Sequence, residues 1–360
     1  MSPTVRNRKT RRKPTRSRRR AITRKRPRWE TYTDDELLEL RLCDLDLRIA
    51  ATPIETKVAR LYRELERRGL RFRPHVWLST EWFSPDGVPG IAVPFYLAHP
   101  RLAALEERQV FEVEGGTPLW CMQLLRHEAA HAIDCAYELH RRRDWRETFG
   151  LYSAPYLRYY KPKPYSRSFV QHLDMWYAQS HPAEDWAETF AVWLDPNSNW
   201  RKRYRDWPAL KKLEYVDRLM EEIDGRPQTV RSRERVEALG TLDRKLKDHY
   251  AMKKKRYGVA HPHFYDADLR RLFPPLIGAR GKSAAAFLRR VRPELRRAVS
   301  RWTGEYQYTV DRVIEDMIER CSELDMRYER TEYAVRQDAV VLLAVQTMNY
   351  LYEGHHRLVR

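Results

Sequence analysis

Two histidines with a glutamate between them are the residues of this chain best suited to chemistry. His127 and His131 are four residues apart in the sequence His-Glu-Ala-Ala-His, and Glu128 directly follows the first. On a helix, side chains four residues apart lie on one face, so both imidazoles could bind the same metal ion. Glu128 would then contact a water on that metal without being a ligand. The spacing therefore predicts half of a zinc hydrolase site, and two histidines without a metal are the simpler alternative.

Two carboxylates further along the chain could complete the ligand set. Glu184 and Glu188 are also four residues apart, and Pro182 suits the first turn of a helix that would carry both. Carboxylates on a partly buried helix are costly unless a positive group meets them, and zinc would be such a group. We predict Glu184 as the third ligand and Glu188 as the carboxylate that orients a ligating histidine. His181, Asp185 and Glu188 remain alternative third ligands, and two solvated acids on an amphipathic helix are the other interpretation.

The first motif needs a helix to place its histidines on one face, and the flanking residues predict one over 117–140. Thr117 suits the N-cap and Pro118 the first helical position, where a missing N–H costs little. A Gly-Gly pair ends whatever precedes them, and no further Pro or Gly interrupts the segment. Apolar residues beside the motif indicate that this helix is buried.

The other expected elements follow from apolar periodicity and turn signals. Alternating apolar residues predict strands, and the prolines within the first two strands favour sheet edges or bulges. We expect strands over 71–80, 90–97 and 109–113, a helical region over 33–69, and helices over 167–179, 231–250, 284–299, 306–324 and 332–352. The last three predict a small helical bundle or a cap on the region that carries the motifs.

Several stretches of the chain resemble a known family. The metal motif, followed by a helix with two glutamates four residues apart, is the pattern of the gluzincin metallopeptidases. The stretches LRHEAAHAID, WYAQSHPAEDWAETFAVWL, RFRPHVWLSTEWFSPDGVPGIAVPFYLAHP and WPALKKLEYVDRLM are similar to the bacterial zinc-binding metallopeptidases, and the likeness covers residues 40–223. Many members of that family begin with a Cys-rich zinc ribbon, whereas a basic segment stands in its place here.

The resemblance implies a zincin-like fold, with a small sheet over the helix of the first motif and a helical lobe that supplies Glu184. In that fold the strand expected at 109–113 would pair with an extended peptide substrate. In some gluzincins a tyrosine near the position of Tyr177 donates a hydrogen bond to the oxyanion, which a phenol can do because it stays protonated at neutral pH. Tyr159 and Tyr160 are alternatives to Tyr177, and core packing is the other role open to each.

The net charge of +19 is unevenly distributed along the chain. Residues 1–28 contain 14 Lys or Arg and no acid, so the remainder is only mildly basic. We expect this segment to be disordered and to bind nucleic acid or another polyanion through its charge, with a simply solvated tail as the alternative. Its Arg pairs are not followed by an apolar stretch, so we expect neither a secretory nor a twin-Arg signal.

Three further features bound the class of protein. No run of apolar residues is long enough to predict a membrane-spanning helix. The four cysteines are widely spaced and form no C-x-x-C pair, which predicts buried free thiols of a cytoplasmic protein: Cys43, Cys121, Cys135 and Cys321. His261 and His263 resemble a second metal pair, but a solvated loop is favoured because no acid or cysteine lies at ligand spacing before them.

Together these features predict an α+β protein of three parts. These are a basic tail over 1–30, a zincin-like metallopeptidase domain over 31–228 and a mainly helical region over 229–360. The predicted function is zinc-dependent hydrolysis of peptide bonds, with Glu128 as the general base. The alternative is a catalytically inactive zinc-binding adaptor that binds nucleic acid or another polyanion through the tail. A protease recruited to nucleic acid would combine both.

Overall fold

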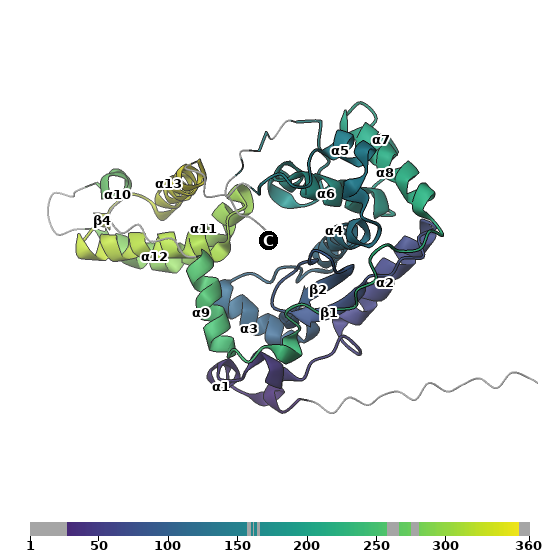
Figure 1. The fold of residues 1–360 in the computed structure, drawn as a ribbon. Coiled ribbons are helices and arrows are strands. Elements are labelled where there is room, and N and C mark those ends of the chain that lie inside the picture. The colour runs from purple at the N-terminus through teal and green to yellow at the C-terminus, as the bar shows by residue number, and fades with distance from the viewer. Residues whose placement is uncertain are drawn as a thin grey trace, which may run out of the picture.

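The computed structural model describes residues 27–156, 160, 162–163, 166–257, 266–274 and 281–352. The basic segment before residue 27 lies outside them, as do Tyr159, His261 and His263. Within the described residues the fold mixes many helices with two small two-stranded sheets (Figure 1). The predicted α+β class is therefore confirmed as a mixed, mostly helical fold.

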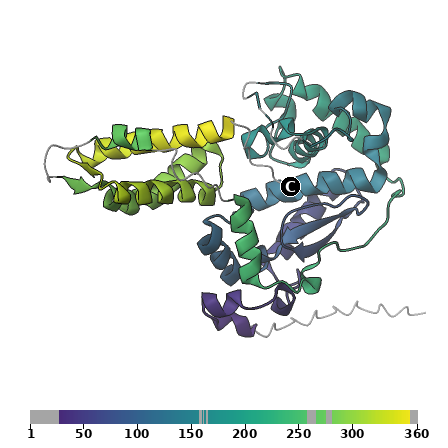
Figure 2. The same ribbon diagram turned by 60° about the vertical axis from the view of Figure 1, so that its left-hand side comes forward.

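Helix α4 (Pro118–Tyr137) carries the first motif and lies between the larger sheet and a layer of helices (Figure 2). Thr117 caps it as predicted, because its side chain accepts a hydrogen bond from the N–H of Trp120. The helix ends before the predicted residue 140, because Glu138 adopts the left-handed conformation. Elements distant in sequence that pack against it include α2 (Pro53–Arg67), β2 (Gly90–Pro94) and α6 (Pro182–Leu194).

The larger sheet consists of two parallel strands, β1 (His75–Ser79) and β2, in the register His75↔Gly90 to Ser79↔Pro94. Both strands lie within the predicted ranges but are shorter. Gly90 is required here, because a Cβ at this position would lie only 2.5 Å from the His75 ring and 2.7 Å from the Trp77 ring. With two strands only, both are edge strands, in agreement with the positions of the prolines.

The prediction of a strand over 109–113 is wrong. Helix α3 (Pro100–Val110) covers its first half, and Phe111 ends that helix in the left-handed conformation. His99 caps α3 by accepting a hydrogen bond from the N–H of Arg101, and Pro100 occupies the first turn. The edge strand that was expected to hold an extended substrate therefore does not exist at these residues.

Two helix predictions were also wrong. Over 167–179 only a 3₁₀ turn forms, η5 (Asp174–Gln179). Over 231–250 the chain is mostly irregular and runs beside β1, where its carbonyl groups contact strand side chains. The indole N–H of Trp77 donates to Val236, and the hydroxyl of Ser79 donates to Glu237. The charges of this segment resemble those of an exposed helix, but the chain is held along the sheet instead.

The expected helical region over 33–69 is confirmed, with interruptions. Thr33 and Glu36 form the capping box that starts its first helix. The elements before α2 are η1 (Arg28–Thr31), α1 (Asp34–Leu38) and η2 (Leu42–Leu45). The remaining elements of the main body are η3 (Phe95–Ala98), η4 (Leu139–Arg141), α5 (Arg143–Phe149), α7 (Trp200–Arg203), α8 (Ala209–Ile223), η6 (Leu239–Thr241) and α9 (Leu246–Tyr257).

The predicted C-terminal bundle is present and stands beside the main body in Figure 2. Its elements are α10 (Asp266–Leu272), β3 (Lys282–Ser283), α11 (Ala284–Thr303), α12 (Gln307–Glu323), β4 (Arg327–Tyr328) and α13 (Glu332–Tyr352). Phe111 links the two parts, because the guanidinium of Arg296 lies 3.9 Å from its ring centroid and Tyr308 stacks on it.

The buried clusters do not divide at residue 229, where the third part was predicted to begin. Leu246 and Tyr250 share a buried cluster with Trp29 and Leu37 of the N-terminal elements. The separate core of the bundle begins at Leu269. Helix α9, which carries both residues, therefore packs with the main body.

All four cysteines are free thiols, but only Cys121 and Cys321 are buried, while Cys43 and Cys135 are partly exposed. None of the described helices combines the length and apolar character needed to cross a bilayer.

Candidate metal centre

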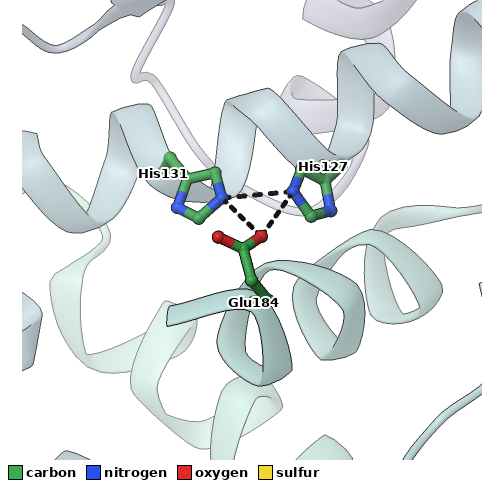
Figure 3. Close-up of side chains that lie close together, drawn as sticks. All are labelled: His127, His131 and Glu184. Carbon is green, nitrogen blue, oxygen red and sulfur yellow. Dashed lines mark hydrogen bonds and ion pairs between the residues drawn. The ribbon is translucent and has the colours of Figure 1, made fainter. Parts of the chain in front are cut away.

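Helices α4 and α6 bring three of the predicted residues together (Figure 3). The Nε2 atoms of His127 and His131 are 3.1 Å apart. The Oε2 atom of Glu184 lies 3.0 Å from the first and 3.3 Å from the second. His127 and Glu184 are buried, and His131 is partly exposed. These residues form the one group of three His, Cys, Asp or Glu side chains, among those described, whose atoms converge as metal ligands do.

The donor atoms fit a zinc ion in both chemistry and spacing. Zinc binds imidazole nitrogen and carboxylate oxygen at about 2.0–2.1 Å, which in tetrahedral geometry separates neighbouring ligand atoms by about 3.3 Å. The three observed separations of 3.0, 3.1 and 3.3 Å are close to that value. Two ring nitrogens that face one buried carboxylate oxygen at these distances also favour a cation between them. The group could therefore hold a metal ion.

Glu188 contacts His127, as the orienting role predicted for it requires. Its Oε1 atom lies 2.8 Å from Nδ1 of His127, and its Oε2 atom accepts a hydrogen bond from the N–H of Leu173. An ionised carboxylate can only accept a hydrogen bond, so this contact places the proton of a neutral His127 ring on Nδ1. The lone pair of Nε2 is then available to a metal ion. Both oxygens of Glu188 are thereby engaged away from the three ligand atoms.

The alternative ligands His181 and Asp185 point elsewhere. Nδ1 of His181 caps α6 by accepting from the N–H of Ala183, and its Nε2 lies 2.8 Å from the carbonyl oxygen of Ala154. Asp185 pairs with Lys212, whose Nζ lies 2.5 Å from its Oδ2. Each side chain has another partner, which leaves Glu184 as the candidate for the third ligand.

Glu128 is buried next to His127 in α4, and one of its carboxylate oxygens makes no hydrogen bond to the described residues. Its Oε2 atom has no hydrogen-bond partner among the described residues, although it is fully enclosed. Burial raises the pKa of Glu128 above its usual value, and the nearby histidines oppose that rise. Its backbone carbonyl accepts from the hydroxyl of Ser84, which ties the motif to the loop between the two strands. A buried carboxylate with an unused oxygen can take a proton from a water molecule.

The tyrosine that contacts a ligand is one that sequence reasoning did not single out. The hydroxyl of Tyr156 donates to Oε1 of Glu184 at 2.8 Å. Partial burial of the hydroxyl, together with the charge of Glu184, raises the pKa of Tyr156, so this phenol stays a donor. Tyr177 is buried with its ring 5.7 Å from the ring of His127, and Tyr160 is buried as well. The signal for Tyr156 was weak: it lies in the Tyr- and Pro-rich stretch between the two motifs.

The three side chains also shift one another's pKa values. Burial alone would lower the pKa of His127, but its hydrogen bonds with Glu184 and Glu188 hold that pKa well above the usual value. Burial likewise opposes protonation of His131, and the charge of Glu184 outweighs it. Burial would raise the pKa of Glu184, but the two histidines hold it well below the usual range. A metal ion that binds here must displace protons from the imidazoles.

Two buried contacts fix the helices that carry the ligands. The guanidinium of Arg126 forms two hydrogen bonds to Glu64 of α2, at 2.8 and 3.0 Å, directly beside the first histidine. The indole N–H of Trp186 in α6 donates to the carbonyl oxygen of Ala130 in α4 at 2.9 Å. These contacts hold α2, α4 and α6 in one arrangement, so the ligands are preorganised by rigid elements.

In comparisons with protein-family models, curated proteins and solved structures, no match to this chain was found. The resemblance to zinc-binding metallopeptidases therefore stays a prediction that rests on the motifs quoted above. The metal centre itself rests on the positions of its side chains.

Proposed function

We propose that this protein is a zinc-dependent hydrolase that cleaves peptide bonds. The observation that carries the proposal is the convergence of His127, His131 and Glu184 on one point, with Glu128 buried next to the first histidine. Three protein ligands leave one position for water, which is the arrangement typical of catalytic rather than structural zinc sites.

A bound zinc ion would supply a Lewis acid that polarises a carbonyl and lowers the pKa of water toward about 7. The residues of the chain would do the rest. Glu128 accepts the proton of the attacking water through its unpaired oxygen and passes it to the leaving amine. Glu188 keeps the His127 ring oriented throughout.

The choice of peptide bonds over other acyl substrates is supported by the resemblance of the motifs to metallopeptidases. The same residues could hydrolyse any acyl bond whose carbonyl a zinc ion polarises, esters as well as peptides. The substrate class is therefore tested together with activity. A labelled peptide library and a panel of esters would be offered to the zinc-loaded protein, and cleavage of peptides is the expected result.

The decisive variant for the mechanism is Glu128→Gln, which keeps the size of the side chain but removes its basicity. We expect zinc content to be unchanged and hydrolysis to fall by about 10²- to 10⁴-fold, the usual contribution of a general base. Glu147→Gln is the matched control, because Glu147 pairs with Arg143 at the exposed surface of α5. Full activity in the Glu128 variant would show that the proposed mechanism is wrong.

The basic segment supports a separate proposal of polyanion binding. Its 14 Lys or Arg without an acid favour contacts with phosphates that weaken steeply with salt. Deletion of residues 1–28 should abolish salt-dependent binding to nucleic acid and leave hydrolysis intact. Loss of hydrolysis without loss of nucleic-acid binding would contradict this division.

A further inference from the structure

The two oxygens of Glu184 have different partners. Oε2 faces the Nε2 atoms of His127 and His131, as Figure 3 shows. Oε1 accepts the hydrogen bond from the hydroxyl of Tyr156 at 2.8 Å. Because a bond from a hydroxyl to an ionised carboxylate is charge-assisted, it fixes the rotation of the carboxylate about its long axis. One oxygen is thereby aimed at the imidazoles and the other is held toward Tyr156.

Tyr156 is itself held by His181, the N-cap residue of α6, the helix that carries Glu184. Its ring stacks on His181 with a centroid separation of 3.7 Å and an interplanar angle of 14°. His181 cannot rotate freely, because it caps α6 through Nδ1 and contacts the carbonyl oxygen of Ala154 through Nε2. The ring that supports Tyr156 and the carboxylate that it contacts therefore lie within one turn of α6. Tyr156 is thus attached to the helix that carries Glu184.

We propose that Tyr156 is a positioning residue that makes Glu184 a one-oxygen ligand of the metal. This inference rests on the metal-binding function proposed above. A carboxylate can offer a metal one oxygen or two, and a second metal–oxygen bond from Glu184 would use the position that hydrolysis needs for water. By occupying Oε1, the hydroxyl of Tyr156 keeps that position open. The role belongs to the hydroxyl, since the aromatic ring alone would still stack on His181.

The test compares Tyr156→Phe with the wild type after loading both with Co²⁺ in place of zinc. The substitution removes the hydroxyl and keeps the stacked ring, and more than half of Tyr156 is exposed (56%), so the fold should be retained. Tyr152→Phe is the matched control, because Tyr152 lies only four residues before Tyr156 but its hydroxyl donates to Asp86 rather than to a proposed ligand. Visible absorption of Co²⁺ reports the coordination number, since four-coordinate Co²⁺ absorbs more strongly than five-coordinate Co²⁺.

We expect the visible bands of Co²⁺ to weaken and shift in the Tyr156 variant and to stay unchanged in the Tyr152 variant. Identical spectra in all three proteins would overturn the inference, and so would an equal change in both variants. A wild type that binds no Co²⁺ would overturn the metal centre as well. If the spectra change as expected but no peptide is hydrolysed, only the proposed hydrolase function fails.

Discussion

His127 and Glu188 are 61 residues apart in the chain, and their Nδ1 and Oε1 atoms are 2.8 Å apart in the structure. This contact decides which nitrogen of His127 is available to a metal. It also joins α4 to α6 at the level of the ligands, so the helix packing and the protonation of the site depend on the same hydrogen bond. Carboxylates in this position typically make the ligand more basic as well as better oriented.

Replacing Glu188 with Gln should weaken zinc binding by about 10- to 100-fold. The amide keeps the shape, but it can no longer accept hydrogen bonds at both ends, so either His127 or the N–H of Leu173 loses its partner. Competition with a chromogenic chelator would measure the affinity, and near-UV circular dichroism would show that the fold is kept. An affinity equal to that of the wild type would contradict the orienting role.

Zinc affinity should fall as the pH is lowered, and the fall should begin above pH 6.5. Burial opposes protonation of both histidines. Glu184 and Glu188 outweigh burial at His127 and raise its pKa well above the usual value of 6.5. Glu184 also raises the pKa of His131, by less. In the metal-free protein these raised pKa values contribute stability that is complete below about pH 6.5 and is lost as the pH rises through the folded values.

The rise in Tm on adding zinc should therefore grow with pH across that window, because the metal-free state loses stability there while the imidazoles become free to bind. Calorimetry at matched ionic strength, with and without zinc, would measure it. A zinc-induced shift that stays constant between about pH 6 and pH 8 would contradict the assignment of both histidines as ligands.

Arg126→Met should destabilise the protein by about 3–5 kcal/mol, because it leaves the carboxylate of Glu64 buried without its main partner. The double variant with Glu64→Leu should recover part of that loss, since it removes both buried charges. Denaturant unfolding of the single and double variants would measure the free energies. If the double variant is less stable than Arg126→Met alone, the buried pair is not the source of the cost.

The candidate ligand set was predictable because helical periodicity is a strong signal. Spacing of four residues places His127 and His131 on one face of α4, and Glu184 and Glu188 on one face of α6, before any tertiary contact is known. The cap at Thr117 was equally visible. The three C-terminal helices were predictable for the same reason, since their apolar residues recur along one face.

Contacts that depend on the path of a loop could not be predicted from the sequence. Tyr156 has no periodic relation to Glu184, and only the folded loop brings its hydroxyl to the carboxylate. The strand predicted over 109–113 failed for a different reason. The apolar spacing there suits a short strand, but the helix that begins at Pro100, after the N-cap His99, runs on to Val110. The irregular segment before α9 was misread because its charges suit a helix, whereas tertiary contacts to β1 hold it extended.

The most direct measurement is the zinc content of the purified protein by mass spectrometry, in the wild type and in Glu184→Ala and His181→Asn variants. The asparagine can still cap α6, so that variant removes a candidate ligand without removing the helix start. We predict one zinc per chain in the wild type, kept in the His181 variant and lost in the Glu184 variant. A wild type that holds no zinc after reconstitution, or a Glu184 variant that keeps it, would contradict the central claim.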